Sequence, residues 1–375
     1  MKGNLNIGTY LGIPVKIHWT FGLLIIFVGY VGVTNGLDKG EIVAFGLYMM
    51  VLFLCVVFHE YGHAIMARKY GVKTKDIILS PIGGVARLES IPKEPYKELF
   101  IALAGPMVNV IIAVTLSIIT ISLYNGGILP SSESLELLKY PSEFIRFVIV
   151  MNVALFIFNL IPAFPMDGGR VLRSLLAFKI GRKRATIIAS IIGRILAIGF
   201  IILGLFNSYL LLTIIGVFIY VTAGSENRSV MMSDLLEKTP VSKILNTHYT
   251  PIGLNENMDV PIEIFMRGGE KNFIVINELD GSVVGSLPEL FLLDTIKKGT
   301  MELKVFQVMS SMNKSINDKS TMMEAYNIMT QDGLAILSVV NDYGQMVGVI
   351  DRAAISRFLD ISFRNMDKKK SRAII

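Results

Sequence analysis

Cysteine is almost absent from this sequence. The 375 residues include one, Cys55, which excludes a disulfide framework. Charge is scarce as well: 18% of the residues are Asp, Glu, Lys or Arg, whereas 52% are hydrophobic. A soluble domain of this length needs a more charged surface, so the composition excludes an ordinary soluble protein. The net charge of +6 does not indicate a nucleic-acid partner, because the basic residues lie beside apolar segments.

Three long stretches contain no charged residue, namely those between Glu98 and Glu133, Arg146 and Asp167, and Arg194 and Glu226. Each can hold a helix of about 20 residues, enough to cross the hydrocarbon core of a bilayer. With two N-terminal segments, the sequence predicts a polytopic α-helical membrane protein. The six expected spans are 18–35, 42–65, 99–124, 146–165, 185–206 and 208–224.

The loops between these spans predict the orientation of the chain. Residues 66–97 carry seven Lys or Arg and residues 166–184 carry six, whereas 34–41 and 125–145 carry more acid than base. Basic loops face the cytoplasm. We therefore expect a multi-pass protein of the cell membrane with its N- and C-termini both cytoplasmic.

The loop 66–97 also contains strand-forming sequence. Its segment Lys75–Leu88 has Ile, Leu and Val residues interrupted by Pro81, Gly83 and Gly84, which is typical of strands and turns. Non-helical backbone at membrane depth must lie against protein or a water-filled cavity. The sequence therefore predicts a small membrane-associated β-sheet beside the helices.

From Glu226 onward the composition is an ordinary mixture of charged and apolar residues, and this part contains a repeat. Phe273–Ile276 corresponds to Ile336–Val339 at an offset of 63 residues. Each unit predicts a helix, a strand, a helix, two strands and a helix, and two such units are expected to pack together. We divide the chain into a membrane domain at 1–225, a linker at 226–239, repeats at 240–300 and 301–362, and a basic tail at 363–375.

An HExxH motif, His59-Glu60-Tyr-Gly-His63, ends the second expected span. Residues four apart share one helix face, so His59 and His63 can bind one metal ion, and Glu60 can reach a metal-bound water. The five letters alone often occur by chance. Ionisable groups inside a membrane, however, are costly and are functional by default.

A catalytic zinc ion usually has three protein ligands, and Asp167 is the best third candidate. It ends the fourth expected span, where Pro162 and Pro165 would break the helix. That span runs parallel to the HExxH span, so both end at similar depth. Asp167 could instead cap the next helix. One Zn2+ held by two His and one Asp would activate water for amide hydrolysis, with Glu60 as the base.

Two asparagines in the expected spans have alternative roles. Asn159 precedes Asp167 by eight residues and is a candidate to stabilise an oxyanion or hold the substrate backbone. Asn159 and Asn109 could equally be polar contacts between helices, and for Asn109 we favour that role.

These motifs resemble the site-2 protease family of intramembrane zinc metalloproteases, in the branch with a C-terminal pair of CBS domains. The matching pieces are the HExxH motif, Gly83-Gly84, Ala104-Gly105-Pro106 with Asn109, and the segment from Asn159 to Gly169. The resemblance implies zinc at His59, His63 and Asp167, with Glu60 catalytic. It implies that the substrates are transmembrane segments of other proteins, which unwind locally and pair with a strand edge.

The resemblance of residues 240–362 to CBS domains is looser. Such pairs bind adenine nucleotides through a hydroxyl residue and an Asp, but Gly348–Ala354 has Asp351 and Ala354 at those positions. Adenine-nucleotide binding and a docking or homodimerisation role therefore both stay open. The basic tail could touch anionic lipid of the bilayer.

Two other functions compete with proteolysis. A CBS-regulated membrane transporter could use intramembrane His, Glu and Asp residues to relay ions, although the sequence shows no inverted repeat. An inactive relative could act as a scaffold, although Glu60 and all three candidate ligands are intact.

Overall fold

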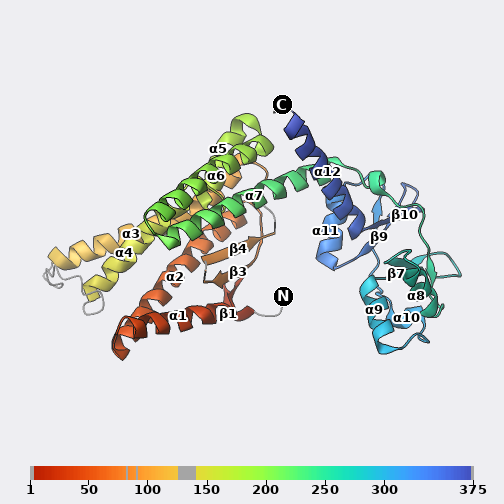
Figure 1. Cartoon of the computed structure of the whole chain (residues 1–375), viewed down its shortest axis with the longest axis horizontal. Helices are drawn as coiled ribbons and strands as arrows, with labels where there is room; N and C mark the ends of the chain where they lie inside the picture. Colours follow the sequence, from red (N-terminus) through yellow and green to blue (C-terminus); the bar gives the residue numbers. More distant parts are fainter. Residues whose placement is uncertain (1–3, 82, 90–91, 126–140, 373–375) are drawn as a thin grey trace. The chain divides into compact units, whose positions relative to one another are not determined.

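The computed structural model describes residues 4–81, 83–89, 92–125 and 141–372. The chain divides into two compact units, Met1–Arg228 and Ser229–Ile375. The first contains long helices and a small sheet, and the second contains shorter helices and strands (Figure 1). Most of the expected acidic loop at 125–145 lies outside the described residues.

Long helices make up most of the first unit. In chain order they are α1 (Phe21–Thr34), α2 (Lys39–Lys69), α3 (Pro95–Asn125), α4 (Pro141–Asn159), α5 (Asp167–Ile180), α6 (Arg182–Phe206) and α7 (Leu210–Lys238). Within the described residues, four of them are long and apolar enough to cross a membrane: α2, α3, α6 and α7. The other two expected spans fall on α1, a shorter apolar helix of 14 residues, and on α4, of 19 residues. The expectation of a polytopic helical membrane protein is confirmed.

Helix α2 has a well-defined beginning and end. The Asp38 carboxylate accepts a hydrogen bond from the Glu41 N–H, and the Glu41 carboxylate accepts one from the Asp38 N–H. This capping box satisfies two backbone donors that a helix start leaves open. Arg68 and Lys69 lie in the last turn, where positive charge interacts favourably with the helix dipole. The HExxH motif lies two turns before this end.

The expected strands form half of a four-stranded sheet. β3 (Thr74–Ser80) pairs antiparallel with β4 (Gly83–Leu88), as the sequence predicts. Two further strands that were not predicted, β1 (Asn4–Tyr10) and β2 (Ile13–His18), complete the order β1-β2-β3-β4. Only two residues connect β1 and β2, and both have positive φ, as a tight hairpin turn requires. The sheet buries its apolar face against Tyr61 and Ala64 of α2.

A buried carboxylate ties three strands of this sheet together. Asp76 on β3 is 1% exposed and accepts hydrogen bonds from Arg87 on β4 and Lys16 on β2, at 2.6 and 2.7 Å. The hydrogen bond from Arg87, supported by Lys16, outweighs burial and lowers the pKa of Asp76 to about 2. The carboxylate therefore stays ionised in the folded protein.

Two segments outside the six expected spans are helical. The loop 166–184 contains α5, and the linker 226–239 forms the last turns of α7, up to Lys238. Both segments are polar, so a search for apolar membrane spans does not detect their helices. Lys238 and Asp234 nevertheless form an ion pair four residues apart, which supports a solvent-exposed helix. Helix α7 therefore begins in the first unit and ends in the second.

The second unit follows the expected repeat element by element. The first copy contains η1 (Val241–Ile244), β5 (Ile252–Gly253), α8 (Asp259–Met266), β6 (Phe273–Ile276), β7 (Val283–Leu287) and α9 (Glu289–Lys298). The second copy contains α10 (Val305–Val308), β8 (Ser315–Asn317), α11 (Met322–Asp332), β9 (Ile336–Val340), β10 (Met346–Asp351) and α12 (Arg352–Arg372). Each copy has one three-stranded sheet with an apolar core, and the two copies exchange their first short helices: Val241 of η1 lies in the core of the second copy and Val305 of α10 in that of the first. Helix α12 includes most of the expected basic tail.

Candidate metal centre

The structure brings three of the predicted site residues together in the first unit. His59 and His63 lie one turn apart on α2, and Asp167 is the first residue of α5. All three are buried, and one ligand atom of each lies within 4.8 Å of the others. Asp167 Oδ2 is 3.2 Å from His59 Nε2 and 3.0 Å from His63 Nε2. Their role as metal ligands stays a prediction that this geometry supports.

The spacing of these atoms fits a zinc ion. The two Nε2 atoms are 3.1 Å apart, so all three separations lie between 3.0 and 3.2 Å. A tetrahedral zinc ion at 2.0–2.1 Å from each ligand would place them about 3.3 Å apart. Two His and one carboxylate are also a donor set that catalytic zinc uses.

A glycine on the neighbouring helix leaves room for this cluster. Gly105 lies on α3, and a Cβ atom there would be 2.2 Å from His63 Nε2 and 2.7 Å from His59 Nε2. Any side chain at this position would therefore fill the space between the two rings. Gly62, within the HExxH motif, would meet the Ala104 carbonyl at 2.6 Å if it carried a Cβ. The two glycines allow α2 and α3 to pack closely at the ligands.

Helix α3 also fixes the orientation of the His63 ring. His63 Nδ1 lies 2.7 Å from the Ile101 carbonyl oxygen. A carbonyl oxygen can only accept a hydrogen bond, so Nδ1 carries the proton and Nε2 keeps its lone pair. A second hydrogen bond of this kind is typical of metal-binding histidines.

His59 has a comparable partner in Asn109, which sequence reasoning took for a contact between helices. The Asn109 Nδ2 lies 3.2 Å from His59 Nδ1, and Asn109 Oδ1 is buried without a hydrogen-bond partner. A half-turn of the amide brings Oδ1 to Nδ1, where it accepts the ring proton and leaves Nε2 free for a metal. The sequence signal was the spacing: Asn109 lies one helical turn after Gly105, on the same face of α3.

Glu60 lies at the edge of the sheet. Its Oε2 accepts a hydrogen bond of 2.7 Å from the Ala86 N–H on β4. A Cβ at Gly84 would be 2.8 Å from Glu60 Cγ, so the glycine predicted in this loop allows the close approach. β4 is the last strand in the sheet order, and Glu60 therefore occupies part of its open edge.

The loop before α5 determines where Asp167 lies. Residues 160–166 are irregular, as Pro162 and Pro165 predict, and α5 begins directly at Asp167. Gly168 packs against this loop, since a Cβ would be 2.3 Å from the Leu160 and Ile161 carbonyl oxygens. Asp167 thus starts the next helix, and its carboxylate faces the two histidines.

Asn159 is the last residue of α4 and is partly exposed. Within the described residues, no hydrogen bond joins its side chain to the three candidate ligands or to Glu60. Its catalytic role stays a prediction.

Comparisons with known proteins agree with these observations. The sequence matches peptidase family M50 over residues 47–140 and 126–203. A zinc metalloprotease of Methanocaldococcus jannaschii is 34% identical over 266 residues, which are 71% of this chain and 72% of the relative.

Two solved structures are similar to separate parts of the chain. The site-2 protease from Methanocaldococcus jannaschii is 36% identical with a TM-score of 0.45, covering 60% of this chain and 95% of its own. The CBS domain of a bacterial CNNM/CorC family Mg2+ transporter is 14% identical with a TM-score of 0.32, covering 36% of this chain and 82% of its own.

Proposed function

The chain belongs to peptidase family M50, and we propose that His59, His63 and Asp167 hold its one zinc ion and that Glu60 is its general base. It is a membrane metalloendopeptidase with a C-terminal CBS-like unit. The observation that carries the site assignment is the convergence of the three buried ligand atoms within 4.8 Å. We also propose that both termini lie in the cytoplasm, from the basic loops at 66–97 and 166–184.

The residues of the chain divide the chemical work. His59, His63 and Asp167 would hold a zinc ion that would polarise the scissile carbonyl and make water more acidic. Glu60 takes the proton of the attacking water and passes it to the leaving amine. The Ala86 N–H holds the Glu60 carboxylate beside β4. Asn159 stabilises the oxyanion or holds the substrate backbone.

The substrates we propose are transmembrane segments of other membrane proteins. A helix presents no free backbone groups, so its peptide bonds must unwind before they can be cut. The open edge of β4 offers unpaired backbone groups to which an unwound segment can add as a further strand. Because Glu60 lies at that edge, the paired segment would pass the base.

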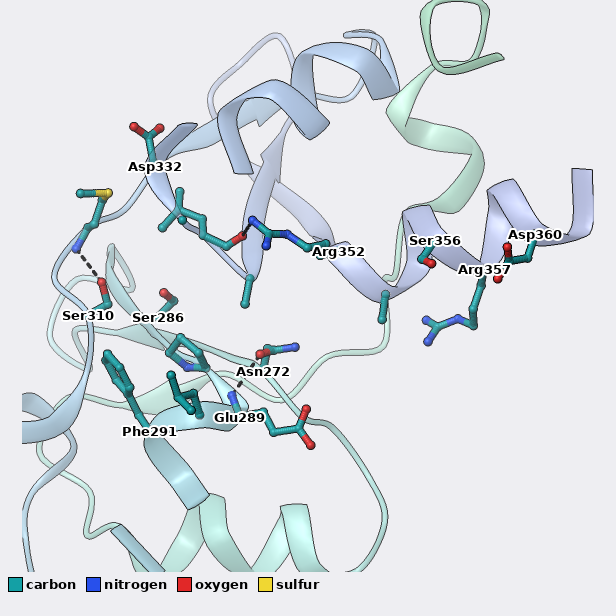
Figure 2. A pocket seen from close by; sticks show the side chains of 17 residues that line it. Asn272, Ser286, Glu289, Phe291, Ser310, Asp332, Arg352, Ser356, Arg357 and Asp360 are labelled. Atoms are coloured by element: carbon teal, nitrogen blue, oxygen red, sulfur yellow. Dashed lines mark hydrogen bonds between the residues drawn. The ribbon is translucent and has the colours of Figure 1, made fainter. Parts of the chain in front are cut away.

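The second unit contains a cavity between its two repeats, with a volume of about 780 Å³. Figure 2 shows Ser286 and Phe291 of the first repeat on one side and Arg352 and Ser356 of the second repeat on the other. Arg352 already donates hydrogen bonds to the Met329 and Leu334 carbonyls.

Of the two residues at the nucleotide-binding positions, one makes another contact and the other has an apolar side chain. Asp351 accepts a hydrogen bond from the Ala354 N–H and so caps α12. Ala354 has no polar side chain. We therefore propose a regulatory or oligomerising role for the second unit, separate from catalysis. Adenine-nucleotide binding is the alternative, and titration of the full-length protein with ATP separates the two.

The variant Glu60→Gln tests the proposed function. It keeps the size of the side chain and removes the base, so zinc should stay bound at one ion per chain while cleavage of a reconstituted membrane substrate is lost. Glu89→Gln is a control, because Glu89 is an exposed carboxylate directly after β4, and it should cleave normally. Normal cleavage by Glu60→Gln would refute the role of Glu60.

The zinc content and ion flux of the wild type separate the competing functions, and Glu60→Gln identifies substrates. Zinc near zero in carefully purified wild type, with ion flux in vesicles, would indicate a transporter, and zinc without any cleavage would indicate a scaffold. An inactive Glu60→Gln enzyme retains its substrates, so membrane proteins that co-purify with it from the native cell are candidates for cleavage.

A further inference from the structure

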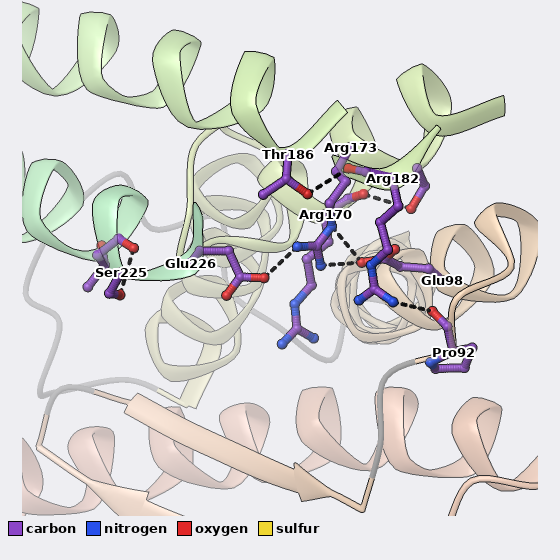
Figure 3. Close-up of polar contacts among 10 residues, drawn as sticks. Pro92, Glu98, Arg170, Arg173, Arg182, Thr186, Ser225 and Glu226 are labelled. Carbon is purple, nitrogen blue, oxygen red and sulfur yellow. Dashed lines mark hydrogen bonds and ion pairs between the residues drawn. The ribbon is translucent and has the colours of Figure 1, made fainter. Parts of the chain in front are cut away.

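Arg173 is a charged side chain that is completely buried in the first unit. It lies on α5, six residues after Asp167, and its Nε donates a hydrogen bond of 2.8 Å to Glu98 Oε1 on α3. The Glu98 side chain is 3% exposed, so this ion pair is shielded from water. Arg173 Nη1 also donates to Glu226 on α7 (Figure 3). One guanidinium therefore joins three helices.

The same guanidinium contacts the loop that leads to Asp167. The Arg173 Cζ lies 4.9 Å from the centre of the Phe164 ring, over its face. Phe164 is 2% exposed and also packs against Ala223 of α7. Thr222, next to Ala223, donates a hydrogen bond of 3.3 Å to the Phe164 carbonyl. Arg173 and α7 together enclose the residue that lies three positions before Asp167.

These contacts join the parts that carry the three candidate ligands. Helix α3 bears Ile101 and Asn109, which contact the outer nitrogens of the two histidines. Glu98 lies three residues before Ile101 on the same helix. The Arg173–Glu98 pair thus fixes the helix of Asp167 to the helix that orients the histidines. Only Asp167 comes from outside the α2–α3 pair, so its position depends most on this junction.

We propose that Arg173 is a positioning residue of the metal site. By binding Glu98 and Glu226 at once, it holds α5 and the Asp167 carboxylate at the distance from His59 and His63 that zinc requires. Glu226 makes this position depend on α7, the helix that continues into the second unit. The inference rests on the proposed zinc site and adds residues that lie outside it.

Two variants test the proposal at different arms of the junction. Arg173→Lys keeps the charge but replaces a planar group with several donors by a compact ammonium, which cannot serve both carboxylates in the same geometry. Glu226→Gln is the milder change, because the Glu226 side chain is 30% exposed and the buried Arg173–Glu98 pair stays neutral. Ser225→Ala is the matched control on α7, since within the described residues the Ser225 hydroxyl donates a hydrogen bond to the Thr222 carbonyl of its own helix.

The readout is the zinc affinity of the full-length protein in detergent micelles, measured by competition with a chelator. Loss of a hydrogen bond to a metal ligand costs about 10- to 100-fold in affinity. We expect Arg173→Lys to weaken zinc binding within this range and Glu226→Gln by about threefold to tenfold. The visible spectrum of the Co2+-substituted variants should also change, because a displaced Asp167 alters the ligands around the metal. Excess zinc should restore cleavage, which a merely unfolded variant would not show.

The outcomes separate this inference from the proposed function. Wild type without stoichiometric zinc would refute the zinc site itself. Wild type with zinc, and Glu226→Gln folded with unchanged affinity and unchanged Co2+ spectrum, would overturn the positioning role alone. If Arg173→Lys does not fold, Glu226→Gln decides the question, with helix content and thermal unfolding as the measure of folding. An equal loss of affinity in Ser225→Ala would also refute the specific role of Glu226.

Discussion

The Asp167 carboxylate lies 3.0 Å from Nε2 of His63, although 104 residues separate the two in the chain. This contact connects the start of α5 to the end of α2 in a buried position. A carboxylate and an imidazole that converge in this way, with a second imidazole at 3.1 Å from the first, favour a metal ion that neutralises and orders them.

Asp167→Asn should remove most of the zinc. The amide has the same size as the carboxylate but lacks its charge, so one of three ligands is lost. The decrease in zinc affinity should exceed the 10- to 100-fold that loss of an outer hydrogen bond costs. Chelator competition measures it, and Asp294→Asn on α9, which is exposed, is the control. Wild-type affinity in Asp167→Asn would mean that Asp167 only caps α5.

Gly105→Ala should abolish zinc binding for a steric reason. The added methyl group would lie 2.2 Å from His63 Nε2, so one ring must leave its place. Alanine otherwise favours helices by about 1 kcal/mol over glycine. Gly46→Ala on α2 is the matched control, because its Cβ would meet no atom within 4 Å. The control should keep its zinc and gain slightly in thermal stability. Bound zinc in Gly105→Ala would disprove the steric argument.

Asn109→Ala should weaken zinc binding by about 10- to 100-fold, because the Nδ1 proton of His59 loses its acceptor. Asn109→Asp keeps an acceptor oxygen and should lose less. Both are compared by chelator competition. Asn152→Ala is the control: Asn152 is also buried within a helix, but it contacts Cys55. Equal zinc affinities in all three variants would return Asn109 to the role of a contact between helices.

The Asp76 cluster predicts an acid-dependent loss of stability. Its pKa is about 2 when folded and 3.8 when unfolded. Because the folded pKa is lower, the stabilisation is complete well above pH 4 and is lost as the pH falls through 2. Its size is about 1 to 2 kcal/mol, since Lys16 and Arg87 are partly exposed.

Thermal unfolding of wild type and Asp76→Asn at pH 6, 4, 3 and 2 measures this effect. The difference in melting temperature should be largest at pH 6 and should narrow toward pH 2. A difference that stays constant over this range would show that Asp76 contributes through shape and not through charge.

The local parts of this site could be predicted because the helix period determines them. His59, Glu60 and His63 need only one turn of α2, and Asp167 followed from the direction of the spans and the two prolines. The repeat in the second unit was also predictable, because the same order of helix and strand patterns occurs twice in the sequence.

The contacts that sequence reasoning missed depend on distant segments. Asn109 looks like any polar residue in a span until α3 lies against α2. Arg173 is a basic residue in a polar segment, and only folding buries it between Glu98 and Glu226. The strands β1 and β2 are only seven and six residues long. Strand β2 pairs with β3 about 60 residues further along the chain, for example Val15 with Ile77, so this pairing could not be read locally.

If substrates pair with the open edge of β4 as proposed, this edge has a consequence for which sequences the enzyme cleaves. Pairing to a strand uses main-chain groups, which every residue has. The choice of cleavage site would therefore depend on how easily the substrate helix unwinds at that point. We expect glycine, proline and asparagine near the cut bond, and unrelated side chains elsewhere. A single protease of this kind could then cleave transmembrane segments of many different proteins, provided that each segment contains one site that unwinds easily.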